Sequence, residues 1–169
     1  KGYTSDKLIE MMKKENVSSG IVSLGGNVQT FGKKNDGSNF RVGIQDPFRA
    51  DEATYVGVVS ISDKAVVTSG GYQRYFEENG KRYHHIIDTS TGYPAENSLA
   101  SVSIVCESGE LADGLSTSLF IMGLEKGSEF WRENREKFDV VFVDNNGEIY
   151  ITEGLSQCFE SKQPYKVIS

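Results

Sequence analysis

The chain has 169 residues, of which 37% are hydrophobic and 25% charged, and its net charge is −6. A chain of this length can bury roughly 70% of its unfolded surface, so we expect one folded domain with a substantial core. The negative charge argues against non-specific nucleic-acid binding, and no apolar run approaches the ~20 residues of a membrane-spanning helix. Cys106 and Cys158 lack the spacing of a metal site. We expect two buried thiols there, although a disulfide remains open.

The first part of the chain predicts one helix followed by several strands. Thr4 or Ser5 can cap a helix that runs to about Glu15. Residues 19–24 then predict a strand that ends at Gly25-Gly26, where we expect either a bulge or the close approach of a ligand to the backbone. Further strands are predicted over residues 40–45, 55–61 and 65–69.

The second part predicts hairpins on either side of two helices. Strands over 72–76 and 82–87 are expected to meet at Asn79-Gly80, a dipeptide that favours a primed turn. A strand over 99–106 precedes helices over 110–122 and 125–137, with Ser108 as the first cap and Gly123 just after the first helix. A last hairpin joins 140–143 to 148–152, and we expect the residues after Pro164 to lie loosely on the surface. These elements indicate an α+β fold with a largely antiparallel sheet and interspersed helices.

The helix that follows Ser108 carries the clearest chemical pattern. Asp113, Ser116 and Thr117 are related as i, i+3 and i+4, so they share one helical face. A carboxylate beside two hydroxyls offers oxygen ligands to a hard cation such as Mg²⁺, which commonly binds phosphate groups as well. The alternative is an exposed polar stripe beside the apolar side of the helix.

The chain has two histidines, His84 and His85, and they are adjacent at the end of a predicted strand. Neighbouring strand residues point to opposite faces, so at most one of them can face a given cleft. A histidine there can act as a general base, because its pKa lies near working pH, or it can simply bond to a neighbour. Asp88 follows in the loop and can bind a ligand or form an Asx-type turn through Thr91.

Five sequence blocks, in this order, resemble motifs of the ApbE family of flavin transferases. The first two are Lys1-Gly2-Tyr3 with Asp6, similar to A-K-G-Y-A-x-D, and Gly25-Gly26-Asn27, similar to G-G-[DEN]. The others are Thr68-Ser69-Gly70-Gly71-Tyr72 (T-S-G-x-Y), HHIIDTSTGYP (H-x-I-D-P-x-T-G-x-P) and ADGLSTSLFIMG (A-D-A-x-x-T-A-L-x-x-x-G). Thr89 and Ser90 stand where the family commonly has proline and arginine. The resemblance implies an ApbE-like, T-fold-related α+β architecture, with residues 1–169 as one domain from the C-terminal portion of a longer protein.

The resemblance also implies roles for single residues. The family's metal ligands fall on Asp113 and Thr117, with Ser116 close to the ion. His85 matches the histidine expected to deprotonate an acceptor hydroxyl. The family's cofactor contacts fall on Lys1 and on the backbone at Ile87. We add Gly26 and Asp88 as candidate cofactor-binding residues.

The implied activity is a Mg²⁺-dependent transfer of FMN from FAD to a threonine or serine hydroxyl of a target flavoprotein, with release of AMP. The expected partners are FAD and a redox-pump subunit or FMN-binding domain, without nucleic acid. The implied location is the outer side of the cytoplasmic membrane or the periplasm, with a lipid anchor in the missing N-terminal part. Two alternatives remain, a FAD diphosphatase that gives FMN and AMP, and a flavin-binding module without turnover.

Overall fold

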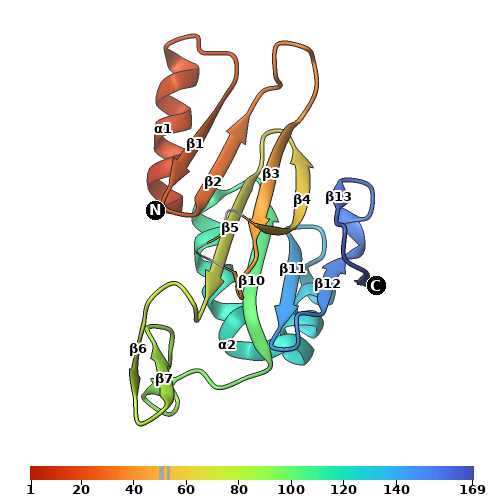
Figure 1. The fold of residues 1–169 in the computed structure, drawn as a ribbon. Helices are drawn as coiled ribbons and strands as arrows, with labels where there is room; N and C mark the ends of the chain where they lie inside the picture. The colour runs from red at the N-terminus through yellow and green to blue at the C-terminus, as the bar shows by residue number, and fades with distance from the viewer. Residues whose placement is uncertain (50–51, 53) are drawn as a thin grey trace.

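The computed structural model describes residues 1–49, 52 and 54–169. The helical elements, shown with the strands in Figure 1, are α1 (Gly2–Lys14), α2 (Gly109–Asn134) and the short 3₁₀ turn η1 (Glu153–Leu155). The strands of the first half are β1 (Gly20–Leu24), β2 (Asn27–Phe31), β3 (Phe40–Gln45), β4 (Tyr55–Ile61), β5 (Ala65–Gly70), β6 (Tyr75–Glu78) and β7 (Lys81–His84). The strands of the second half are β8 (Ile87–Asp88), β9 (Tyr93–Pro94), β10 (Leu99–Cys106), β11 (Asp139–Asp144), β12 (Ile149–Thr152), β13 (Phe159–Glu160) and β14 (Tyr165–Ile168).

The largest sheet has seven strands in the order β1-β2-β5-β10-β11-β12-β14. Its neighbouring strands are antiparallel, except for the last pair, β12 and β14, which is parallel. A three-stranded sheet, β13-β4-β3, and the short pairs β6-β7 and β8-β9 complete the described strands. The predicted α+β class with a largely antiparallel sheet is therefore confirmed.

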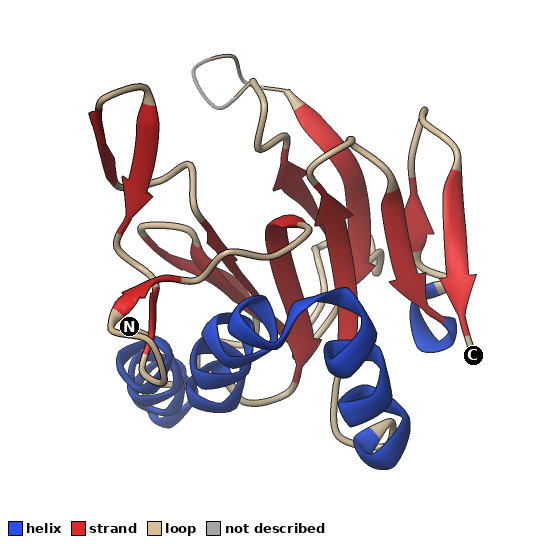
Figure 2. Ribbon diagram, turned by 90° about the horizontal axis from the view of Figure 1, so that it is seen from below, coloured by secondary structure: helices blue, strands red, loops and turns tan. Residues whose placement is uncertain are grey.

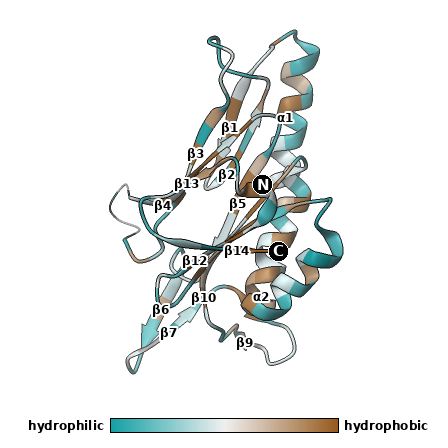
Figure 3. Cartoon of the chain, turned by 90° about the vertical axis from the view of Figure 1, so that its right-hand side faces the viewer, coloured by the Kyte–Doolittle hydropathy of each residue, from teal (hydrophilic) through white to brown (hydrophobic). Residues whose placement is uncertain are grey.

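Three layers form around the seven-stranded sheet (Figure 2), with both long helices on one face and the three-stranded sheet on the other. Side chains alternate along the central strands, as strand geometry requires. Val67 and Ile104 pack towards α2, whereas Val66 and Val105 pack towards β3 and β4. In Figure 3 the hydrophobic colours gather on the inner strands, and hydrophilic colours mark the outer turns of α2 and the β6–β7 hairpin. No helix in the described part of the chain is long and apolar enough to cross a membrane.

Helix α1 begins at Gly2, so the predicted cap at Thr4 or Ser5 is wrong. The Ser5 hydroxyl instead donates to the main-chain oxygen of Gly2 from inside the first turn. The start of the helix is covered by Asp113, which accepts the Gly2 N–H from a distant part of the chain. A local capping rule cannot detect such a long-range partner.

Helix α2 is two helical segments joined at Gly123, whose φ of 79° and ψ of 177° leave helical geometry. This agrees with the predicted break at Gly123, and the second segment ends at Asn134, before the expected residue 137. The predicted cap is also confirmed, because the Ser108 hydroxyl accepts the Leu111 N–H at 3.1 Å.

Strand β2 was not predicted from the sequence, because its inward positions Asn27 and Gln29 are polar although both are buried. It forms a hairpin with β1, and the turn between the two strands consists of Gly25 and Gly26, which have φ values of 56° and 87°. Positive φ at both positions is the geometry of a type I′ two-residue hairpin, so the expected bulge is wrong. The same conformation is found at Asn79 and Gly80, with φ of 52° and 75°, where a primed turn was predicted.

Two further expectations about strands differ from the structure. The strand predicted over 82–87 is divided into β7 and β8, since His85 and Ile86 lie between the two hairpins. The C-terminal residues do not lie loosely, because β14 adds to the edge of the seven-stranded sheet beside β12. The parallel pairing of Ile151 with Val167 fixes its register.

Candidate functional site

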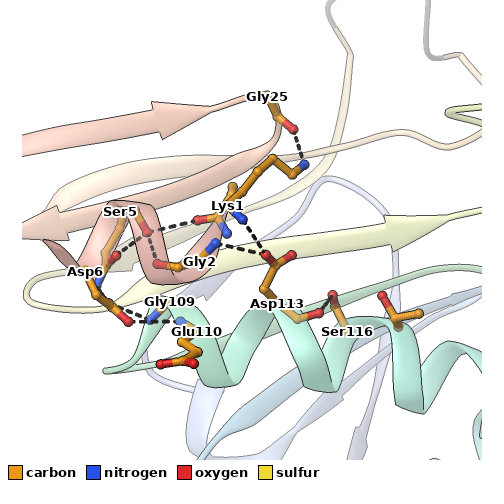
Figure 4. Close-up of polar contacts among 12 residues, drawn as sticks. Lys1, Gly2, Ser5, Asp6, Gly25, Gly109, Glu110, Asp113 and Ser116 are labelled. Atoms are coloured by element: carbon orange, nitrogen blue, oxygen red, sulfur yellow. Dashed lines mark hydrogen bonds and ion pairs between the residues drawn. The ribbon is translucent and has the colours of Figure 1, made fainter. Parts of the chain in front are cut away.

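The predicted metal residue Asp113 lies where the start of α1 crosses α2 (Figure 4). Its Oδ2 accepts the Gly2 N–H at 2.9 Å and lies 3.1 Å from the Lys1 amino nitrogen. The Lys1 side chain extends from the same place to the β1–β2 turn, where Nζ donates to the Gly25 main-chain oxygen at 2.9 Å. Burial raises the pKa of Asp113, but these donors and the Lys1 charge outweigh burial, so the pKa lies below its usual range. The carboxylate is therefore ionised at neutral pH.

A second carboxylate, Asp6, makes the reciprocal contact. It accepts the Gly109 N–H at 2.9 Å and the Glu110 N–H at 3.0 Å, which are the first free amides of α2. The Gln29 side-chain amide and the Ser108 hydroxyl also donate to it. Burial raises the pKa of Asp6, but these hydrogen bonds together hold it below its ordinary value. Each helix thus begins at a carboxylate that the other helix supplies.

The other two predicted metal residues belong to a cluster of hydroxyls. Ser116 is fully buried and Thr117 is half-buried, one turn along α2 from Asp113. The Ser69 hydroxyl on β5 lies 2.9 Å from Ser116 Oγ and 3.0 Å from Thr117 Oγ1. Ser116 in turn donates to the main-chain oxygen of Asp113 at 3.1 Å. Ser69 was not identified as a site residue, although it lies in the quoted Thr68–Tyr72 block.

One ionised carboxylate with neighbouring hydroxyls is a donor set that fits a hard cation such as Mg²⁺. In the described part of the chain, no group of three or more His, Cys, Asp and Glu side chains could hold a metal ion. Asp113, Thr117 and Ser116 would therefore supply part of a coordination shell that water and phosphate oxygens complete. The predicted grouping of these three residues on one helical face is what the structure shows; their role as ligands stays a prediction.

The adjacent histidines have different surroundings. His84 is half-buried: its Nε2 lies 3.1 Å from the Ala95 main-chain oxygen, its Nδ1 accepts the Ile86 N–H at 3.3 Å, and its ring meets Phe120 edge-on. Both ring nitrogens are thus used within the chain, and Nε2 must carry the proton because a carbonyl cannot donate.

His85 is exposed, and its Nδ1 lies 3.1 Å from the Arg74 main-chain oxygen. By the same reasoning Nδ1 carries the proton, which leaves the lone pair on Nε2 available as a base. Nε2 is therefore the nitrogen that would act in the predicted catalytic role, which stays a prediction.

The loop after His85 is held by Asp88. Its Oδ1 accepts both the N–H and the hydroxyl of Ser90, at 2.8 and 2.7 Å, and these bonds hold the pKa of the carboxyl below its usual value. The predicted Asx-type turn therefore exists, but its partner is Ser90, while Thr91 bonds to the Asp88 main-chain oxygen. Ile87, which precedes this turn, is 42% exposed. Nucleotide contact by Asp88 and Ile87 stays a prediction.

A cavity of about 530 Å³ lies beside the histidine segment, lined by His84, Tyr72 and Phe120 among others. His85 does not line it, so the histidine that faces this cavity is the one without a predicted catalytic role. Helix α2 links the histidine segment to the hydroxyl cluster, because Phe120, which meets the His84 ring, follows Thr117 by three residues. Strand β5 forms a second link, because Gly71, which lies against the His84 ring, follows Ser69 by two residues. Within the residues that the structure describes, no hydrogen bond or ion pair joins His85 to Asp113. Around Gly26, a hypothetical Cβ would meet no atom within 4 Å, so its backbone is open to a ligand.

Comparisons with known proteins extend over most of the chain. A FAD:protein FMN transferase of Klebsiella pneumoniae is 39% identical over 152 residues, which cover 90% of this chain and 46% of that protein. The protein of the same name from Treponema pallidum is 40% identical over 141 residues, covering 79% of this chain and 39% of its own length. The chain thus spans about half the length of the curated relatives it matches, or somewhat less.

Solved structures with the same fold give a consistent result. The crystal structure of the ApbE protein from Thermotoga maritima has a TM-score of 0.80 and 34% identity, over 93% of this chain and 50% of that one. The apo form of the Pseudomonas stutzeri flavinyl transferase ApbE has a TM-score of 0.76 and 34% identity, over 93% of this chain and 48% of its own. The sequence also matches the family described as the ApbE family over residues 1–142. The chain therefore belongs to the ApbE family.

Proposed function

We propose that this protein transfers FMN from FAD to a threonine or serine hydroxyl of a target protein and releases AMP. Relatives named FAD:protein FMN transferase support flavin transfer in general. The observation that carries the finer proposal is the grouping of ionised Asp113 with the Ser116 and Thr117 hydroxyls beside Lys1. Mg²⁺ bound there would neutralise charge on the FAD diphosphate.

The residues of this chain would act on the attacking hydroxyl and on the diphosphate that is cleaved. The acceptor oxygen forms a bond to the phosphorus of the FMN half, and the bond from that phosphorus to the bridging oxygen breaks, so AMP leaves with the bridging oxygen. His85 Nε2 takes the proton of the acceptor hydroxyl, in the tautomer that the Arg74 carbonyl fixes. The Lys1 ammonium adds positive charge beside the phosphates. Gly26, Ile87 and Asp88 would contact the nucleotide through the exposed turns described above.

The test uses full-length protein with FAD, Mg²⁺ and a domain that carries the acceptor threonine. We expect a mass gain equal to FMN on the acceptor, together with one AMP for each FMN transferred. FMN and AMP without labelled acceptor would identify a FAD diphosphatase instead, and unchanged FAD would identify a binding module. Either result would reject the transferase proposal.

The proposed role of His85 has its own variants. Replacing a general base costs about 10²–10⁴-fold in rate, so His85→Gln should slow transfer by at least about 100-fold while FAD binding persists. Thr89→Ala, an exposed change in the same loop, is the matched control and should transfer at the wild-type rate. Transfer by His85→Gln at the control rate would remove the histidine from the mechanism.

The target and the location are proposed from the resemblance. We propose a membrane-associated redox-pump subunit or FMN-binding domain as acceptor, and a lipid-anchored enzyme on the outer side of the cytoplasmic membrane. Cell fractionation with labelled fatty acid tests the location. Recovery of unlabelled enzyme in the cytoplasm would contradict it.

A further inference from the structure

Ser69 lies on β5, 47 residues before Ser116 in the chain, yet its hydroxyl contacts two of the proposed metal residues. We infer that Ser69 is a positioning residue, which orients the Thr117 hydroxyl so that its lone pairs are free for a divalent cation. This inference rests on the proposed function, because it concerns the same Mg²⁺ site.

The direction of the hydroxyl chain follows from its last acceptor. Ser116 Oγ lies 3.1 Å from the Asp113 main-chain oxygen, which can only accept, so Ser116 spends its single proton there. The 2.9 Å contact between Ser69 and Ser116 must then use the Ser69 proton. The 3.0 Å contact between Ser69 and Thr117 must in turn use the Thr117 proton.

This order, from Thr117 through Ser69 and Ser116 to the Asp113 carbonyl, is the one assignment in which all three contacts are hydrogen bonds. Thr117 therefore donates towards the sheet, and the lone pairs of its oxygen remain unused by the chain. Without Ser69, the Thr117 proton is free to turn towards the cation position. It can also bond to the carbonyl one turn back in the helix, as threonine commonly does.

Ser69 is suited to this role because its strand is paired with the centre of the sheet. Strand β10 pairs with β5 along its whole length, whereas β2 pairs with it only as far as Val67, and the direct partner of Ser69 is Val102, whose side chain is fully buried against α2. At the next residue, the Tyr72 ring occupies the place that a Cβ of Gly70 would take, so the ring packs directly against this backbone. The hydroxyl is thus presented to α2 from a rigid element.

The orientation matters more than usual because the site is poor in charged ligands. With no cluster of three metal-binding side chains of the His, Cys, Asp and Glu types in the described residues, Asp113 would be the main anionic ligand. A neutral hydroxyl then contributes only if its lone pair faces the ion. Loss of groups that orient metal ligands typically lowers affinity by about 10–100-fold.

The experiment measures Mn²⁺ binding to full-length protein from the EPR signal of the free ion. We expect Ser69→Ala to weaken Mn²⁺ binding by about tenfold, and Ser69→Thr, which keeps the hydroxyl, to restore it in part or fully. The Mg²⁺ concentration for half-maximal FMN transfer should rise by a similar factor, with the rate recovering at saturating Mg²⁺. If Ser69 had a purely structural role, its loss would lower the rate at saturating Mg²⁺ as well, instead of changing only the Mg²⁺ concentration that is needed.

Ser103→Ala is the matched control. Its hydroxyl forms a similar pair with Thr68 at 2.7 Å, on the opposite face of the same two strands, and does not touch α2. It should leave Mn²⁺ affinity unchanged. If Ser69→Ala does not fold, the nearly isosteric Ser69→Cys carries the test with the same expected direction.

Three results would overturn the inference. Wild-type Mn²⁺ affinity in Ser69→Ala, or an equal loss in Ser103→Ala, removes the role of Ser69 but leaves the proposed function intact. No Mn²⁺ binding by the wild-type protein, by contrast, overturns the proposed Mg²⁺ function and this inference together.

Discussion

Removal of the Asp6 carboxylate should destabilise the protein more than any other change of an acidic residue on α1. In Asp6→Ala, the Gly109 and Glu110 amides at the start of α2 lose their acceptor, and so do the Gln29 amide and Ser108 hydroxyl. Loss of a helix cap costs about 0.5–2 kcal/mol, and hydrogen bonds to a charged group are worth about 1.5–3 kcal/mol.

Because Asp6 is only half-buried, water can replace part of these bonds. We therefore expect the free energy of unfolding to fall by about 2–3 kcal/mol, which is near the upper end of these ranges because four donors lose one acceptor, yet far below the sum of four separate bonds. For a chain of this size, that corresponds to a fall in melting temperature of about 5–10 °C. Asp6→Asn keeps one acceptor oxygen and should lose about half as much.

Urea denaturation followed by tryptophan fluorescence measures this loss directly. Trp131 is the chain's single tryptophan, and it is 1% exposed, so its emission reports unfolding of the core. Glu10→Gln is the matched control, since Glu10 lies one turn further along α1 and pairs with Lys7 at the surface. Exposed pairs of this kind are worth about 0–1 kcal/mol, so the control should be close to wild type.

The loss should also depend on pH. Because the folded pKa of Asp6 lies below its ordinary value of 3.8, the carboxylate stabilises the folded state above that pH. This contribution disappears as the pH falls through the lower, folded pKa. The difference between wild type and Asp6→Asn should therefore be constant near neutrality and shrink below about pH 4. A difference no larger than that of Glu10→Gln, or one that does not change with pH, would refute the capping role.

Three other predictions concern the packing and burial of single residues. A Cβ on Gly2 would overlap the main-chain oxygen of Gly109, so Gly2→Ala should lower the free energy of unfolding, measured in urea, by about 1–3 kcal/mol. The control is Gly114→Ala, where a Cβ meets no atom within 4 Å; it should raise the free energy of unfolding by up to about 1 kcal/mol. Burial raises the pKa of Asp139 although the Thr152 hydroxyl donates a hydrogen bond to this carboxylate. The folded protein therefore loses stability as the pH rises through the folded pKa and Asp139 ionises. Asp139→Asn should then stabilise at pH 7, and a melting temperature below wild type would contradict this. Burial raises the pKa of Cys106 to about 11, so this thiol should react with a disulfide reagent at pH 8 only after unfolding; rapid reaction of the native protein would disprove it.

The fold class could be predicted from the sequence where local signals and tertiary structure agree. Asn79-Gly80 gave a primed turn, Ser108 gave a cap, and Gly123 gave a helix break, because each depends on neighbouring residues alone. Strand β2 escaped prediction because buried Asn27 and Gln29 bond to polar atoms of α1 instead of presenting apolar side chains.

The candidate site shows the same division. The shared face of Asp113, Ser116 and Thr117 follows from helical spacing alone, and the structure places these residues together. The contact of Thr117 with Ser69 joins a helix to a strand 48 residues away, and no local pattern encodes it. The sequence could not distinguish the surroundings of the two histidines either, because these depend on which main-chain carbonyl each ring contacts in the folded chain.

One helix connects the separate sequence blocks. Successive turns of the first segment of α2 contact Asp6 at its start, Gly2 through Asp113, Ser69 through Ser116 and Thr117, and His84 through Phe120. At 1.5 Å per residue, Asp113 and Phe120 are about 10 Å apart along the helix axis. The segment therefore holds the histidine loop at a fixed distance from the proposed metal residues. The first segment ends at Gly123, where the helix breaks, and the second segment continues away from the site. A change that bends this segment should thus move the proposed metal residues and the His84 ring together, although it touches neither of them directly.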